Sequence, residues 1–227
     1  MINWLFSQAQ RPERGWDPVP AEHARHYSRS EWQGVNEPLL AQLDDWVGGL
    51  AGKRVLDLGG GPGQYSIAFA RRGAQVTWFD VSRNYQALAQ AKAAELLVAD
   101  AVQFRLGYLD DAPTLLGETY DLVFNRICWY YGRGDRSFAD VVYRLVRPGG
   151  CGYIDTTNSL FNADQLSASA RMRTWLNAAC SIKIGHPYPP RGRIARLLLG
   201  HPVERLLVDY STAASDRVLF KKPGATA

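Results

Sequence analysis

Residues 54–80 constrain the fold of this chain more than any other stretch. They begin with the apolar run VLDL, continue with the glycine-rich segment GGGPG at residues 59–63, and then repeat apolar side chains at helical spacing over residues 64–72. A short apolar run is typical of a parallel strand that is buried on both faces. Glycines let a backbone turn tightly and approach a ligand more closely than any Cβ would allow. We therefore expect a strand, a ligand-binding turn and a helix.

The sequence QVTWF at residues 75–79 predicts a second strand, and Asp80 follows it directly. Ligands of open α/β sheets bind beyond the carboxyl ends of the strands, where an acid can accept both hydroxyl groups of a ribose. The dinucleotide pattern Gly-x-Gly-x-x-Gly/Ala is not met, because its last position is Gln64 or Ser66, depending on the starting glycine. The spacing therefore favours a nucleotide-type ligand other than NAD.

What remains is the pattern acid-x-Gly-x-Gly-x-Gly, with Asp57 as the acid, and it resembles motif I of the class I S-adenosylmethionine-dependent methyltransferases. Asp80 and the sequence Arg-Pro-Gly-Gly at residues 147–150 match two later features of this family. The resemblance implies a doubly wound, Rossmann-like α/β fold. Its sheet would have seven mostly parallel strands, an antiparallel C-terminal hairpin and helices on both faces. A glycine-rich turn that binds no ligand is the alternative.

The resemblance also implies S-adenosyl-L-methionine as the cofactor, S-adenosyl-L-homocysteine as the product, and no metal. In the family, a carboxylate at the end of the third strand commonly contacts the adenine, but that position here is Tyr108. Asp110, Asp111 and stacking on Tyr108 therefore stay open as the adenine contact, and either aspartate could instead cap the next helix. The expected cofactor residues are Tyr27, Asp57, Gly59, Gly60, Gly61, Gly63, Asp80, Val81, Tyr108, Leu109, Asn125 and Arg126.

The rest of the chain predicts one methyltransferase domain with a short N-terminal extension. Residues 1–50 are expected to form an arm followed by lid and packing helices, with Tyr27 in the lid or in ordinary packing. Residues 51–227 are expected to form the methyltransferase domain, and an insertion at about 158–200 should shape the acceptor pocket. Helices are expected over residues 38–47, 64–72, 82–97, 137–146, 164–180 and 193–199. Strands are expected over residues 55–58, 75–79, 102–106, 122–125, 151–157, 203–210 and 217–221.

Methyl transfer from a sulfonium is an in-line displacement, so such an enzyme mainly orients its two substrates. His186 is a candidate base because histidine titrates near neutral pH, although a loop histidine is commonly a turn residue. Asp155, at the end of the fifth strand, is a second candidate base, and Tyr130 could donate a hydrogen bond to the acceptor. The run WYY at residues 129–131 is expected to face the acceptor, with an aromatic cluster at the sheet edge as the alternative.

Composition narrows the possible partners and compartments. The net charge is +4, and the arginines are spread along the chain, which disfavours a nucleic acid as the partner. The three cysteines, Cys128, Cys151 and Cys180, have no metal-type spacing and predict reduced thiols in the core of a cytoplasmic protein. The sequence has no signal-peptide pattern and no run of 18 apolar residues, so no membrane partner is expected.

The expected function is transfer of a methyl group to an N, O or S atom of a small-molecule acceptor, with specialised metabolism as one setting. The WYY run, rather than a basic surface, favours a small acceptor. An RNA or protein methyltransferase is an alternative, but the fourth strand ends in Asn-Arg-Ile-Cys and not in an Asn-Pro-Pro-Tyr element. A module that binds S-adenosylmethionine without catalysis is the other alternative. The sequence specifies neither the acceptor nor the oligomeric state.

Overall fold

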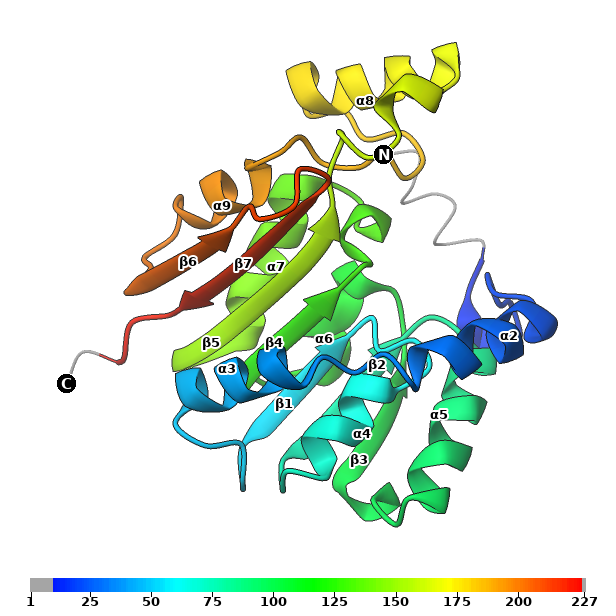
Figure 1. Cartoon of the computed structure of the whole chain (residues 1–227), viewed down its shortest axis with the longest axis vertical. Helices are drawn as coiled ribbons and strands as arrows, with labels where there is room; N and C mark the ends of the chain where they lie inside the picture. Colours follow the sequence, from blue (N-terminus) through cyan, green and yellow to red (C-terminus); the bar gives the residue numbers. More distant parts are fainter. Residues whose placement is uncertain (1–9, 226–227) are drawn as a thin grey trace.

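The computed structural model of this chain describes residues 10–225, and a seven-stranded sheet runs through its centre (Figure 1). The strand order is β3-β2-β1-β4-β5-β7-β6. Strands β1 to β5 pair in parallel, whereas β7 is antiparallel to both β5 and β6. The strands are β1 (Arg54–Leu58), β2 (Gln75–Asp80), β3 (Val102–Leu106), β4 (Tyr120–Arg126), β5 (Val146–Thr157), β6 (Arg205–Asp209) and β7 (Ser215–Lys221). This confirms the predicted sheet and its C-terminal hairpin.

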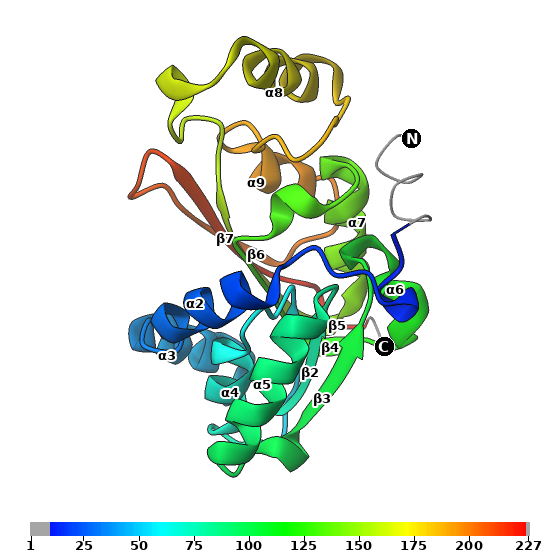
Figure 2. The ribbon, with the colours of Figure 1, turned by 90° about the vertical axis from the view of Figure 1, so that its right-hand side faces the viewer.

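Helices cover both faces of the sheet (Figure 2). They are α2 (Ala21–Glu31), α3 (Glu37–Val47), α4 (Gln64–Ala70), α5 (Arg83–Glu95), α6 (Ala112–Leu116), α7 (Asp135–Leu145), α8 (Ala168–Cys180) and α9 (Arg193–Leu198). Neighbouring residues of β1 point to opposite faces, so Val55 joins a core with α3, α4 and α5, while Leu56 joins a second core with α6, α7 and α9. The apolar run of β1 is therefore explained by burial on both faces.

Short polar residues fix where several helices begin. The Asn36 side chain accepts a hydrogen bond from the Leu39 amide at 2.9 Å and begins α3, and Ser82 accepts one from the Tyr85 amide at 3.2 Å and begins α5. Ser167 does the same for the Ala170 amide at 3.3 Å. The helix expected over residues 164–180 therefore begins only at Ala168, and a separate 3₁₀ turn precedes it.

Other expectations required correction. The sequence Arg-Pro-Gly-Gly is not a turn ahead of β5 but an irregular part of that strand, where the register with β4 shifts and Gly149 has a φ of +74°. Helix α4 ends at Ala70, two residues early, and β6 begins at Arg205. Cys180 is exposed at the end of α8, so only Cys128 and Cys151 are the expected core thiols.

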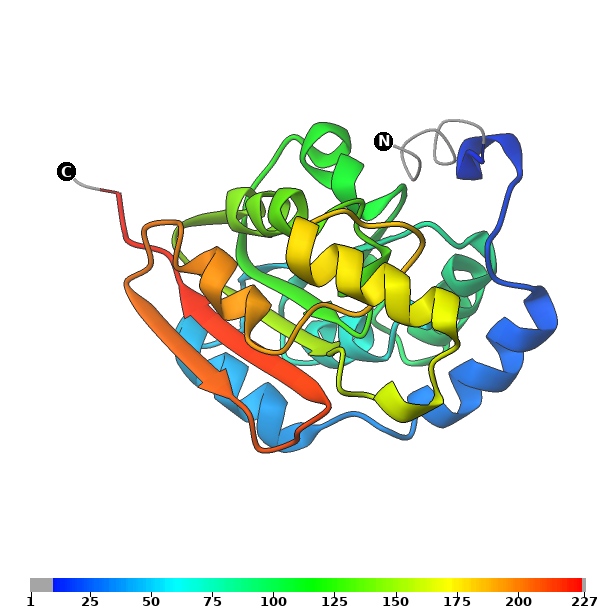
Figure 3. The ribbon, with the colours of Figure 1, turned by 90° about the horizontal axis from the view of Figure 1, so that it is seen from above.

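Segments distant in sequence gather near the carboxyl ends of the parallel strands. Helix α8 lies across this edge, as seen from above in Figure 3. The described part of the N-terminal arm, residues 10–20, is attached to the start of α5 at the same edge. There Asp17 accepts hydrogen bonds from the Asn84 amide at 2.8 Å and from the Ser82 hydroxyl at 2.9 Å. Residues 1–9 of the expected arm lie outside the described residues. None of the described helices is long and apolar enough to cross a membrane.

Candidate active site

The glycine-rich turn after β1 is tied to the end of β2. The amides of Gly59 and Gly60 both donate to the Phe79 carbonyl, at 2.7 and 3.2 Å. A Cβ added to Gly59 would lie 2.3 Å from the Cys128 sulfur, and one added to Gly60 would lie 2.3 Å from the Trp78 ring. Side chains are excluded at both positions because the protein itself fills the space.

Gly61 differs from its neighbours because it faces open space. A Cβ added there would meet no atom within 4 Å, although its φ of +48° still favours glycine. Its amide donates to the Asp80 carboxylate at 3.0 Å, and its carbonyl accepts from the Trp78 indole at 3.0 Å. Gly63 is closed by packing, since its Cβ would lie 2.7 Å from that of Ala89. The turn therefore has one open backbone position, beside Asp80.

Asp80 is fixed at the end of β2 by backbone donors. Besides the Gly61 amide, the Ser82 amide donates to it at 2.9 Å. Burial raises the pKa of Asp80, while these donors act to lower it. Each carboxylate oxygen has further lone pairs, so Asp80 can still accept from the hydroxyl groups of a ligand.

Asp57 lies beneath the turn rather than beside the open position. It is 3% exposed and accepts a hydrogen bond from the Ser66 hydroxyl of α4 at 2.7 Å. Burial raises the pKa of Asp57 to about 7, and the nearby charge of Asp80 adds to this effect. Asp57 thus supports the turn by linking β1 to α4.

The end of β4 holds a buried amide. Asn125 donates from Nδ2 to the Leu58 carbonyl at 2.8 Å and to the Cys128 sulfur at 2.9 Å. Its Oδ1 is buried without a hydrogen-bond partner in the described part of the chain. Cys128 is also buried, and this burial raises the pKa of its thiol. Asn125 therefore ties the first turn after β4 to the end of β1.

Arg126 connects the strand ends to helix α2. Its guanidinium lies 3.5 Å from Glu31 of α2 and 3.6 Å from Asp155 of β5, over the ring of Tyr65. Tyr27 lies on the same helix, where burial chiefly raises its pKa to about 12, and the charge of Glu31 adds to this. Helix α2 is thus held over the strand ends by charged and aromatic contacts.

The region after β3 binds the arm. The Tyr108 ring stacks on Trp16 with centroids 6.1 Å apart, and its hydroxyl donates to the Gln10 carbonyl. Leu109 packs against the core. Asp110 accepts from the backbone amide of Arg133 at 2.9 Å, and Asp111 forms an ion pair with the Arg133 side chain at 3.0 Å. Both aspartates that stayed open as adenine contacts are therefore bound to Arg133.

An aromatic cluster follows β4. Tyr130 contacts Tyr131 and Tyr188, with centroids 4.5 and 5.0 Å away, and the exposed His186 packs against Tyr131 at 4.9 Å. Burial of part of the ring lowers the pKa of His186. Trp129 is fully buried against Phe138, so the expectation that all three residues of WYY face the acceptor is wrong for the tryptophan. The structure brings Tyr130 and His186 into one cluster.

Asp155 belongs to a different group of side chains. It lies 3.6 Å from Arg126 and 3.7 Å from Arg217, which also pairs with Asp209. These four charged residues line a pocket of about 580 Å³ that contains no member of the aromatic cluster. Burial raises the pKa of Asp155, and the two guanidinium groups lower it. Asp155 is thus placed in an ion-pair chain, apart from His186 and Tyr130.

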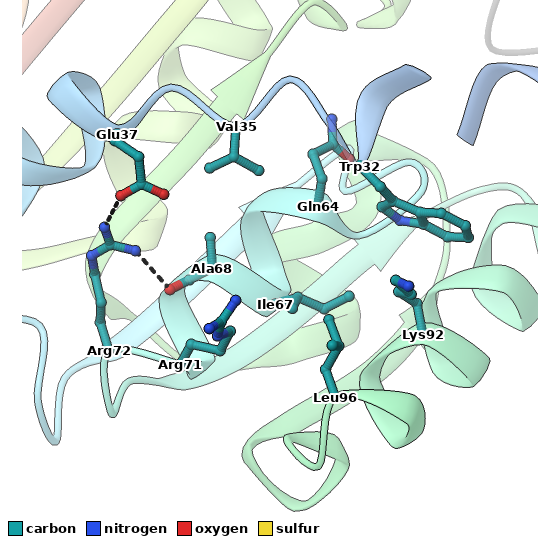
Figure 4. Close-up of a pocket in the computed structure, with 10 residues that line it drawn as sticks. All are labelled: Trp32, Val35, Glu37, Gln64, Ile67, Ala68, Arg71, Arg72, Lys92 and Leu96. Atoms are coloured by element: carbon teal, nitrogen blue, oxygen red, sulfur yellow. Dashed lines mark hydrogen bonds and ion pairs between the residues drawn. The ribbon is translucent and has the colours of Figure 1, made fainter. Parts of the chain in front are cut away.

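A second pocket, of about 570 Å³, lies on the flank of α4 and α5 (Figure 4). Figure 4 shows Arg72 turned toward Glu37 and toward the Ala68 carbonyl, with Trp32 and Lys92 at the other end. Neither of these two pockets is lined by Gly61 or Asp80. No group of three or more His, Cys, Asp or Glu side chains in the described range could hold a metal ion.

A buried ionic cluster that was not predicted from the sequence lies next to the aromatic cluster. Asp135 accepts from the Trp129 indole and from Lys183, both at 3.2 Å, and from Asn177 at 3.1 Å. Arg193 lies 3.4 Å away. Desolvation lowers the pKa of Lys183, and the charge of Asp135 raises it. The placement of Lys183 between two isoleucines was the only signal for this cluster in the sequence.

Known proteins resemble this chain over residues 55–150 and in its fold. A family model described as a methyltransferase domain matches residues 55–150. A ubiquinone biosynthesis O-methyltransferase from Pseudomonas savastanoi pv. phaseolicola is 36% identical over 131 residues, which are 57% of this chain and 56% of that protein. The chain thus spans just over half of the length of that relative.

Two solved structures share the fold across most of the chain. An O-methyltransferase family protein from Burkholderia thailandensis has a TM-score of 0.65 and 18% identity, covering 90% of this chain and 60% of the other. The N-methyltransferase NodS from Bradyrhizobium japonicum, in complex with S-adenosyl-L-homocysteine, has a TM-score of 0.60 and 14% identity, covering 91% and 90%. Residues 55–150 therefore match a methyltransferase domain, and the chain shares its fold with these two solved structures.

Proposed function

We propose that this protein transfers the methyl group of S-adenosyl-L-methionine to an N, O or S atom of a small molecule. The observation that carries this proposal is the open backbone position at Gly61, whose amide is bonded to the Asp80 carboxylate at 3.0 Å. A cofactor with a ribose fits this geometry, because Asp80 has lone pairs left for hydroxyl groups. The cofactor would supply a methyl group already activated on a sulfonium, and no metal is needed.

The residues around the turn would hold different parts of the cofactor. Asp80 would bind the ribose, and Arg126 and Tyr27 would border the methionine part. The stacked pair of Trp16 and Tyr108 is the favoured adenine platform, because Asp110 and Asp111 are bound to Arg133. The enzyme would act mainly by orienting donor and acceptor.

The acceptor side is assigned to the aromatic cluster. Tyr130 would donate a hydrogen bond to the acceptor, and His186 would accept its proton where the acceptor carries one. The names of the similar proteins include both O- and N-methyltransferases, which supports a small acceptor of either kind. The three free cysteines support a cytoplasmic location.

Titration calorimetry with S-adenosyl-L-homocysteine tests the cofactor site. We expect one-to-one binding that Asp80→Ala weakens about 10- to 100-fold, since hydrogen bonds to a charged group are lost. Gly61→Arg should abolish binding by filling the open position. The matched control is Asp100→Ala at an exposed aspartate, which should bind like the parent protein. Unchanged affinity in both Asp80→Ala and Gly61→Arg would refute the proposal.

A further inference from the structure

The pocket on the flank of α4 and α5 has the size of a small-molecule site. It measures about 570 Å³, within the roughly 300–1,000 Å³ that is usual for pockets of small ligands. We propose that it binds a small aromatic carboxylate, with the ring against α4 and the carboxylate paired with Arg71. Gly61, Asp80 and the aromatic cluster do not line this pocket, so the inference is independent of the function proposed above.

Much of the pocket lining is apolar. Ile67 and Ala68 of α4 line it together with Leu96, which follows α5 (Figure 4). Trp32 lies at one end, and its indole is held in place because Nε1 donates to the Pro62 carbonyl at 2.9 Å. A ring that is already fixed loses little freedom when a ligand packs against it. The pocket therefore favours a ligand with an apolar, aromatic body.

The charges around the pocket favour an anion with a single charge. Three cations and one carboxylate line it, namely Arg71, Arg72, Lys92 and Glu37. Arg72 pairs with Glu37, and Lys92 pairs with Glu95 at 2.6 Å. The exposed Arg71 side chain has no hydrogen-bond or ion-pair partner among residues 10–225. One positive charge is therefore left for a ligand, and it attracts an anion.

Helix α4 places this charge beside the apolar lining. Ile67 and Arg71 are four residues apart, and such residues share one face of a helix with their Cβ atoms about 5–6 Å apart. A ring that packs on Ile67 can therefore direct a carboxylate attached to it toward Arg71. A guanidinium binds a carboxylate through two parallel N–H···O hydrogen bonds. An aromatic carboxylate thus matches both parts of the pocket.

2-Naphthoate and its neutral isostere 2-naphthamide test the site, with binding followed by amide chemical shifts in isotope-labelled protein. We expect 2-naphthoate to shift the amides of residues 64–72 and 92–96. It should bind about 10-fold more tightly than 2-naphthamide, since only the carboxylate forms charge-assisted hydrogen bonds. Arg71→Gln should remove this preference, and its exposed position leaves the core intact. The matched control is Arg171→Gln, at an exposed arginine of α8, which should keep the preference.

Four results would overturn the inference. They are the absence of shifts with 2-naphthoate, equal affinity for the acid and the amide, and loss of the preference in both arginine variants, which would make it an effect of net charge. The fourth is a set of shifts centred on residues 59–63 or 129–131, because the probe would then occupy the region assigned to methyl transfer. Failure of S-adenosyl-L-homocysteine to bind would refute the proposed function and leave this inference standing.

Discussion

Burial beneath the glycine turn makes the ionised form of Asp57 costly in the folded protein. In the unfolded chain its carboxyl group loses its proton near pH 4, but burial raises its pKa in the folded protein to about 7. Between these values the folded state holds a proton that the unfolded state has lost. The contribution of Asp57 to the free energy of unfolding therefore falls as the pH rises from about 4 to about 7, and it is constant above.

Asp57→Asn should remove this dependence and keep an acceptor for the Ser66 hydroxyl. We expect the difference in unfolding free energy between variant and parent to grow in favour of the variant over that pH range. It should reach at most about 4 kcal/mol, at about 1.4 kcal/mol for each pH unit. Urea unfolding at several pH values measures it, with the exposed Asp45→Asn as control. If the unfolding free energies of Asp57→Asn and the parent change with pH in parallel, the pKa of Asp57 is not raised by folding, and the prediction is wrong.

Gly60 and Gly61 are adjacent residues with opposite surroundings. Gly60→Ala should cost about 1 to 3 kcal/mol of stability, because its Cβ would lie 2.3 Å from the rigid Trp78 ring. Gly61→Ala meets no atom within 4 Å and should cost only about 1 kcal/mol for its left-handed backbone. Urea unfolding of both variants checks the ranking, and a larger loss at Gly61 would contradict it.

At the scale of elements, the Asp135 cluster attaches helix α8 to helix α7. Helix α8 buries only Asn177, which donates to Asp135, whereas its large apolar residues Met172 and Trp175 are exposed. The helix is therefore held by polar contacts rather than by an apolar face. Lys183 belongs to the same cluster and precedes the loop that carries His186 and Tyr188.

Asp135→Ala should destabilise the protein by about 3 to 5 kcal/mol, because Lys183 and Arg193 would be left without their buried counter-charge. Asp140 lies on the exposed side of α7, the helix that also carries Asp135, and forms an ion pair with His201. Asp140→Ala removes this pair and should cost under about 1 kcal/mol of stability. The two unfolding curves measured side by side test this difference. Equal losses would mean that the buried cluster contributes no more than a surface pair.

Elements were predictable wherever the signal was local. The glycine turn, Asp80 and the Ser82 cap lie within thirty residues, and their chemistry is encoded in neighbouring positions. The pairing of Lys183 with Asp135 spans 48 residues and left no periodic signal. The contacts of Arg133 with Asp110 and Asp111 also join residues more than 20 positions apart, so the sequence did not predict them. It likewise did not predict that Trp129 is buried while the two tyrosines that follow it are accessible.

At the scale of the whole molecule, one edge of the sheet gathers the N-terminal arm, helix α2 and the glycine turn. The arm is attached through Asp17, helix α2 through the contact of Glu31 with Arg126, and the glycine turn through Asp80. Glu31 also accepts from Gln64 at 2.9 Å, at the start of α4. A molecule bound at Gly61 would therefore restrict all three segments together.

Hydrogen exchange measures this restriction directly. Bound S-adenosyl-L-homocysteine should slow amide exchange in residues 10–20, in α2 and in the glycine turn, because ligand binding to the folded state lowers the population of open forms. Asp17→Ala should remove the added protection from residues 10–20 and keep it in the turn, since only the arm loses its anchor. The control is Asp164→Ala at an exposed aspartate ahead of α8, which should match the parent. Intact protection of residues 10–20 in Asp17→Ala would mean that the arm is held without Asp17, by the stack of Trp16 on Tyr108 and by the hydrogen bonds that its carbonyls accept from Arg83 and Asn84.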